Sequence, residues 1–160
     1  MATVIAIANQ KGGVGKSATA QHLAYTLAED HGQRVLLVDM DPQMSTTEAF
    51  GFEDTEGASM AEVLGGTVKG TKTIIQIMRK LQVGRGSLWL APADISMAAC
   101  EIGLAGRLIG REAVLKTALW LVQQQFDVII LDCPPSLGML TINCLIASQW
   151  VIVPTGATPK

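Results

Sequence analysis

The stretch that decides the fold reads NQKGGVGKSATA and covers residues 9–20. It follows a β-branched apolar run at residues 3–8, which predicts a buried strand. It leads into residues 16–30, where apolar side chains recur at helical spacing until His31 and Gly32 end the pattern. A glycine loop between a strand and a helix can turn its backbone N–H groups inward, and the helix adds its own free N–H groups and positive dipole end. This order of elements predicts a cradle for phosphate groups.

The side chains at the end of this loop suit the same purpose. In the usual pattern G-x-x-x-x-G-K-S/T, the lysine reaches the β- and γ-phosphates and the hydroxyl meets Mg²⁺. Gly15, Lys16 and Ser17 match the end of the pattern, but Gln10 stands where its first glycine belongs. The loop carries instead a second lysine, Lys11, near its entrance. A glycine turn with two solvated lysines is the alternative, and the flanking strand and helix make it the weaker one.

Two further predicted strands deliver aspartates. Residues 34–39 form an apolar run that ends in Asp39, with Asp41 two positions later, and the apolar run within residues 126–135 ends in Asp132. Ligands of parallel α/β sheets bind outside the carboxyl ends of the strands, so Asp39 and Asp41 are expected beside the phosphate cradle. One or two carboxylates together with phosphate oxygens are the normal surroundings of Mg²⁺. A solvated acidic turn is the alternative for the first pair, although two like charges there would repel without a cation.

The rest of the chain predicts more alternation of strand and helix. Apolar residues make up 49% of the sequence and charged residues 16%, as expected where a parallel sheet is covered on both faces. We expect a three-layer α/β/α fold with a mainly parallel sheet, in a single domain over residues 1–160. Residues 51–87 show little clear pattern. The remaining predicted strands are 87–93 and 149–156, and the remaining predicted helices are 59–66, 94–106, 110–124 and 138–147.

Charge and cysteine content exclude several classes. The formal net charge is −2, which does not indicate a general polyanion binder. Residues 28–62 hold nine acidic side chains and one basic one, while residues 63–93 hold five basic and no acidic ones, a pattern more typical of two solvated faces than of a DNA contact. The cysteines, Cys100, Cys133 and Cys144, are odd in number and lack C-x-x-C spacing, which disfavours a disulfide framework or a zinc site. We expect a cytoplasmic protein, without a signal peptide or membrane span, in which these thiols are buried.

The three motifs occur together in a recognisable order. The run KGGVGKS at residues 11–17, the D-x-D at residues 39–41 and the strand that ends at Asp132 together resemble the ParA/MinD family of ATPases, whose P-loop departs from the usual pattern in this way. Pro42 and Gln43 after the D-x-D resemble the ParA side of the family, the ParA/Soj type. Residues 90–104, 110–145 and 151–159 also match, so the resemblance covers almost the whole chain. It implies ATP and Mg²⁺ as cofactors and ATP hydrolysis as the activity.

The family resemblance also implies a role for each matching residue. Lys11 resembles the signature lysine, which in the family reaches across a nucleotide-sandwiched dimer to the partner's phosphates. Asp41 resembles the residue that positions the attacking water. Lys16 would hold phosphate, and Ser17, Asp39 and Asp132 would manage Mg²⁺. The residues implied to form the nucleotide-binding loop are Lys11, Gly12, Gly13, Val14, Gly15, Lys16, Ser17 and Ala18.

The resemblance implies a molecular switch for plasmid or chromosome partitioning. Such a switch would form an ATP-dependent homodimer, respond to a ParB-like centromere-binding activator and bind DNA non-specifically at the nucleoid. Family members usually continue well beyond residue 160, so we expect this domain to be incomplete at its C-terminus and to lack the main DNA-binding basic region. The alternatives are a non-catalytic nucleotide-binding fragment and a MinD-like positioning ATPase; the latter would need a C-terminal amphipathic helix for the membrane, and none is present here.

Overall fold

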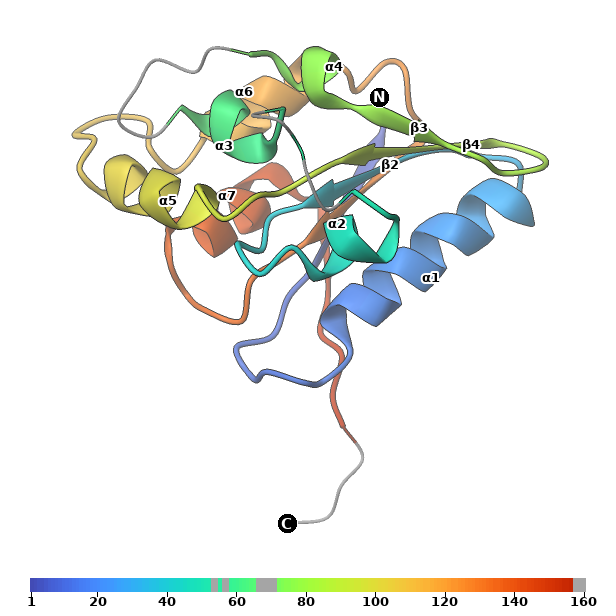
Figure 1. Ribbon diagram of the computed structural model, residues 1–160, viewed down its shortest axis with the longest axis horizontal. Coiled ribbons are helices and arrows are strands. Elements are labelled where there is room, and N and C mark those ends of the chain that lie inside the picture. The colour runs from blue at the N-terminus through green and yellow to red at the C-terminus, as the bar shows by residue number, and fades with distance from the viewer. Residues whose placement is uncertain (53–54, 56–57, 66–71, 157–160) are drawn as a thin grey trace.

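A computed structural model describes residues 1–52, 55, 58–65 and 72–156. The strands among them form a six-stranded sheet of order β3-β4-β2-β5-β1-β6 (Figure 1). Neighbouring strands run parallel except for β3, which pairs antiparallel with β4 at one edge. This confirms the mainly parallel sheet. The single domain over residues 1–160, incomplete at its end, stays a prediction. The strands are β1 (Thr3–Ile7), β2 (Arg34–Asp39), β3 (Arg79–Leu81), β4 (Ser87–Ala91), β5 (Val128–Asp132) and β6 (Trp150–Ile152).

Helices connect most of these strands, as the predicted alternation requires. The helix expected over residues 110–124 is shorter, because residues 111–113 and 121–125 form turns and a bend instead. Helix α4 and strand β3 lie in the stretch whose pattern predicted little. None of the described helices is long and apolar enough to cross a membrane. The helices are α1 (Lys16–Glu29), α2 (Ser45–Ala49), α3 (Met60–Leu64), α4 (Ile74–Ile77), α5 (Met97–Ala105), α6 (Val114–Trp120) and α7 (Met139–Ala147).

Helix α1 covers one face of the sheet (Figure 1). Its buried side chains there are Ala20, Ala24 and Ala28, which are small and four residues apart. They pack with Val35 and Leu37 of β2. Leu36, which lies between these two residues, faces the opposite side of the sheet. Since alanine adds little bulk, the helix axis can approach the strands closely and place its N-terminus at the carboxyl edge of the sheet.

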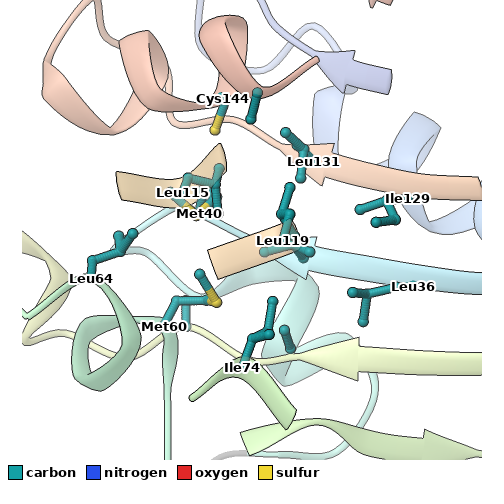
Figure 2. Close-up of a cluster of buried hydrophobic side chains, with 14 of the residues drawn as sticks. Leu36, Met40, Met60, Leu64, Ile74, Leu115, Leu119, Ile129, Leu131 and Cys144 are labelled. Atoms are coloured by element: carbon teal, nitrogen blue, oxygen red, sulfur yellow. The ribbon is translucent and has the colours of Figure 1, made fainter. Parts of the chain in front are cut away.

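Helices α3 to α7 cover the other face. Figure 2 shows side chains of α3, α4, α6 and α7 meeting those of the strands. Leu36 of β2 and Ile129 of β5 point into this layer, and both are fully buried. Successive residues of a strand face opposite sides, so one apolar run can serve both layers. Helix side chains that complete this cluster are Met60, Leu64, Ile74, Leu115, Leu119 and Cys144.

Strand β6 forms the other edge of the sheet and exposes much of its surface. The side chains of Trp150, Val151 and Ile152 are 67%, 47% and 38% exposed. Trp120 on α6 is 65% exposed as well, so the apolar surroundings of these tryptophans in the sequence do not place them in the core. All three cysteines are buried, as expected of small apolar side chains.

Candidate functional site

The parallel register brings the predicted motifs to one edge of the sheet. Asp132, the last residue of β5, lies opposite Ile7 at the end of β1 and opposite Asp39 at the end of β2. The glycine loop leaves β1 directly after Ile7, and the D-x-D begins at Asp39. Segments far apart in the chain therefore converge where ligands of parallel α/β sheets bind.

The glycine loop has the backbone that a phosphate cradle needs. Gly13 and Gly15 have positive φ angles of 71° and 85°, which disfavour residues with a side chain. A Cβ added at Gly12, Gly13 or Gly15 would meet no atom within 4 Å, so the space beside the loop is open. Gly15 is the residue before α1, and the free N–H groups of that helix face the same end.

The two lysines of the loop lie in different surroundings. Lys16 is only 7% exposed, and its Nζ donates a hydrogen bond of 3.3 Å to the carbonyl oxygen of Lys11. The Lys11 side chain is exposed to solvent, although its backbone N–H donates to Asn9 Oδ1 at 2.9 Å. Val14 is half-buried and Ala18 is exposed. The loop therefore folds over Lys16 and leaves Lys11 outside.

Asp39 is fully buried and well supplied with donors. Its Oδ2 accepts hydrogen bonds from the backbone N–H and the hydroxyl of Thr47, at 2.8 and 2.7 Å, and its Oδ1 accepts one from the Asp41 N–H at 3.0 Å. Burial raises the pKa of Asp39 to about 7, against the opposing effect of the Thr47 hydroxyl. The Thr47 hydroxyl in turn accepts from the Ala93 N–H at 2.9 Å. Asp39 thus ties α2 to the ends of β2 and β4.

Asp132 is also fully buried, but only one of its oxygens is paired. Its Oδ2 accepts a hydrogen bond of 2.7 Å from the Thr46 hydroxyl. Its Oδ1 has no hydrogen-bond partner within the described part of the chain. Burial raises the pKa of Asp132, while the hydroxyls of Thr46 and Ser17 and the charge of Lys16 counteract this rise. An unpaired buried carboxylate oxygen is costly, so this atom suits a cation or a donor that the chain does not supply.

Asp41 follows the last residue of β2 by two positions. It is 7% exposed, and its Oδ1 accepts a hydrogen bond of 2.9 Å from the Gln43 N–H. Its charge contributes to the raised pKa of Asp132, after the larger effect of burial. Met44, which follows this turn and precedes α2, has a positive φ of 60°. This conformation is uncommon for a residue with a side chain and starts α2 directly beside the aspartates.

The oxygen atoms of this site suit a hard cation that is bound jointly by the protein and by a phosphate-bearing ligand. No group of three or more His, Cys, Asp or Glu residues that could hold a metal ion occurs in the ranges that the structure describes. The oxygens of Ser17 and Asp132 are of the kind that Mg²⁺ prefers, and Mg²⁺ normally completes its octahedron with water and phosphate oxygens. The open loop beside them leaves room for such phosphates.

The patterns in the sequence did not single out Gln21, Thr46 and Thr47. The hydroxyls of the two threonines each bond one strand-end aspartate, and Gln21 Nε2 donates to Thr46 Oγ1 at 3.0 Å. The only signal available was the position of two threonines a few residues after the D-x-D. Their partners could not be read from spacing, because Asp132 lies 86 residues further along the chain than Thr46.

This fold and site define a class of protein. A buried lysine at the head of a helix, open glycines before it and strand-end aspartates beside it make up a P-loop nucleotide-binding domain. A family model described as an AAA domain matches residues 2–159. The chain belongs to this family, within the ParA-type P-loop ATPases that its similarities to known proteins also indicate.

Similar proteins extend the comparison. The sporulation initiation inhibitor protein Soj of Bacillus subtilis is 45% identical over 154 residues, which are 96% of this chain and 58% of that protein. The chromosome partitioning protein ParA of Myxococcus xanthus is 38% identical over 152 residues, which are 94% of this chain and 51% of that protein. The crystal structure of cobyrinic acid a,c-diamide synthase from Mycobacterium smegmatis, with bound ATP analog and magnesium, has 43% identity and a TM-score of 0.81, and the match covers 97% of this chain and 60% of that one. The chain therefore spans little more than half the length of these proteins.

Proposed function

We propose that this chain binds Mg²⁺–ATP and hydrolyses it as a ParA-type switch in plasmid or chromosome partitioning. The observation that carries this proposal is the combination of a buried Lys16 in an open glycine loop with the half-paired carboxylate of Asp132 at the same edge of the sheet. Two similarities support the proposal. The similar protein from Myxococcus xanthus is named a chromosome partitioning protein. The similar structure from M. smegmatis contains a bound ATP analog and magnesium.

The proposed binding of nucleotide follows from charges and donors. The N–H groups of Gly12, Gly13 and Gly15 and of the first turn of α1 would surround the phosphates, and Lys16 would neutralise part of their charge. Ser17 and Asp132 would hold Mg²⁺, which, when bound, neutralises charge on the phosphate oxygens. Asp39 would not contact the cation directly, because its oxygens already accept hydrogen bonds from Thr47 of α2 and from the Asp41 N–H. It would reach the cation only through water.

Asp41 and Lys11 are the residues proposed for hydrolysis itself. One oxygen of Asp41 is bonded to its own turn, which orients the carboxylate, and it could align an attacking water. Lys11 projects into solvent from the same loop, so a second copy of the chain could receive its charge at the transferred phosphoryl group. A cation contributed in this way would make hydrolysis depend on dimerisation.

The wider role in partitioning requires partners. We propose an ATP-dependent homodimer, a ParB-like activator and non-specific DNA as partners, with a cytoplasmic location at the nucleoid. Among the basic side chains of residues 63–93, Arg79, Lys80 and Arg85 lie on or near β3, whereas Lys69 falls outside the described residues. Their contribution to DNA binding would be secondary, because the resemblance to the family implies a main basic region beyond the residues of this chain.

A second candidate function arises from the similar M. smegmatis protein, which is named a synthase. The same phosphate site could serve an ATP-dependent amide-forming reaction, in which hydrolysis would require an acceptor. A third possibility is nucleotide binding without turnover. Supplying Mg²⁺–ATP alone separates the first proposal from the other two. The partitioning proposal requires that ADP and phosphate appear, and faster at concentrations at which dimers form.

The first experiment is a calorimetric titration of the 160-residue chain with Mg²⁺ and a non-hydrolysable ATP analogue. We expect saturable binding of one nucleotide per chain. Lys16→Ala should abolish it, since the phosphates lose their buried cation, whereas Lys116→Ala, which changes an exposed lysine on α6, should not. Tight binding by the Lys16→Ala variant would show that the cradle is assigned wrongly. A folded wild-type chain that gives no binding would contradict the proposed function of this chain.

A further inference from the structure

Two adjacent hydroxyl side chains in the first turn of helix α2 contact different strands. Thr46 and Thr47 are adjacent in sequence and both fully buried. The hydroxyl of Thr47 completes the bonding of Asp39, whereas the hydroxyl of Thr46 occupies one oxygen of Asp132 and leaves the other unpaired. The two carboxylates are therefore bonded differently. Both oxygens of Asp39 accept hydrogen bonds, whereas only one oxygen of Asp132 does so.

The bond from Thr46 to Asp132 has a defined direction. Gln21 Nε2 donates to Thr46 Oγ1 at 3.0 Å, and it also lies 3.5 Å from the Ser45 carbonyl oxygen. A hydroxyl has one proton, so a Thr46 oxygen that accepts from Gln21 directs its own proton to Asp132 Oδ2, 2.7 Å away. The three side chains form a chain of hydrogen bonds that runs from α1 through α2 to β5.

The first link of this chain is positioned by the phosphate loop. Gln21 follows Ser17 by one helical turn, so the two side chains lie on the same face of α1. Helix α1 therefore carries Ser17 and Gln21 on one face, and Gln21 connects that face to Asp132 through the Thr46 hydroxyl.

We propose that Thr46 is a positioning residue that fixes the rotation of the Asp132 carboxylate, so that Oδ1 is presented to Mg²⁺, and that Gln21 orients the Thr46 hydroxyl for this purpose. The inference rests on the proposed function, because it concerns the same cation. Partners that hold a metal ligand in place typically affect metal affinity about 10- to 100-fold. Since Thr46 lies on the helix that follows Asp41, a shift of α2 would change the metal site and the water-positioning carboxylate together.

The test compares the affinity of the full 160-residue chain for ADP with and without Mg²⁺, measured by calorimetry. In Thr46→Val, which keeps the shape but removes the hydroxyl, the gain in ADP affinity on adding Mg²⁺ should fall about 10- to 100-fold. The affinity for ADP alone should stay the same, because no phosphate contact is changed. Thr46→Ser, which keeps the hydroxyl, should retain the gain. Thr117→Val removes an exposed hydroxyl on α6 and serves as the matched control.

A second variant covers the case in which Thr46→Val does not fold. Gln21→Met keeps the length of a half-buried side chain and removes the donor to Thr46, together with its longer contact to the Ser45 carbonyl oxygen. It should reduce the Mg²⁺-dependent gain in the same direction. An unchanged gain in folded Thr46→Val, or in folded Gln21→Met where the first variant does not fold, would overturn the inference while leaving nucleotide binding intact. A wild-type chain that binds ADP in neither buffer would instead overturn the proposed function, and this inference with it.

Discussion

The hydroxyl of Thr47 gives the sharpest stability prediction for this chain. It is fully buried, donates to Asp39 Oδ2 at 2.7 Å and accepts from the Ala93 N–H at 2.9 Å. Thr47→Val preserves the volume and removes both bonds. A hydrogen bond to a charged group contributes about 1.5–3 kcal/mol, and a buried N–H left without a partner costs about 1–3 kcal/mol. At about pH 8, where Asp39 is mostly charged, we therefore expect the free energy of unfolding to fall by about 2.5–6 kcal/mol, which is a large part of the stability of a small domain.

The assay is urea-induced unfolding of the wild type and the variant, followed by circular dichroism. Thr47→Ser is the matched control, because it keeps the hydroxyl and loses only a buried methyl group. Deletion of one such group costs about 1 kcal/mol, so the serine variant should be clearly more stable than the valine variant. A double-mutant cycle with Asp39→Asn should give a coupling energy of about 0.5–3 kcal/mol between the two positions.

The pH dependence of the same variant provides an independent check. Asp39 has a folded-state pKa of about 7, above its ordinary value of 3.8, so the folded state binds more protons between these values and this carboxyl lowers the stability as pH rises through that window. The Thr47 hydroxyl opposes the rise in pKa, so its removal should raise the pKa of Asp39 further. The loss of stability in Thr47→Val should therefore be greater at about pH 8 than at about pH 6.

Two results would refute this reasoning. A loss below about 1 kcal/mol would mean that solvent or a neighbouring group replaces both bonds, and that Asp39 does not depend on Thr47. A loss that is the same at both pH values would mean that the hydroxyl does not act on the charged form of Asp39.

The remaining predictions concern turnover, dimerisation and acid stability. Asp41→Ala should retain nucleotide binding and dimerisation but stop phosphate release, and continued release would contradict its role. Lys11→Ala should retain nucleotide binding and weaken the ATP-dependent dimer seen by light scattering, whereas an unaltered dimer and turnover rate would exclude a role in the partner's site. Arg34 lowers the pKa of Asp127 to about 2, so this carboxylate stabilises the fold above its unfolded-state pKa of 3.8. That small, solvent-screened contribution should disappear as pH falls towards 2 and be absent from Asp127→Asn in acid unfolding curves.

Much of the fold could be predicted because its patterns are local. The strand before the glycine loop, the helix after it and the strand from Arg34 to Asp39 were all predicted close to their observed bounds. Strands buried on both faces need continuous apolar runs, and such runs stand out in the sequence. The stretch that contains α4 and β3 was not predicted, since an edge strand and a one-turn helix are too short to show a period.

The candidate site was predictable in its composition but not in its connections. Lys16, Asp39 and Asp132 could be found because each ends or begins an element at the same edge of a parallel sheet. The unequal bonding of the two buried aspartates, by contrast, depends on Thr46 and Thr47. The exposure of Trp150 similarly depends on its place in an edge strand.

The sequence by itself therefore determined the order of strands and helices, the glycine loop and the set of charged residues around it, because periodicity and turn chemistry act over a few residues. Only the tertiary structure decided the strand order, the closure of Asp39 by hydrogen bonds and the unpaired oxygen of Asp132. These features arise when segments as far apart as Thr46 and Asp132 pack together. The hydrogen-bond partner of a buried side chain is set by that packing, and no local pattern records it.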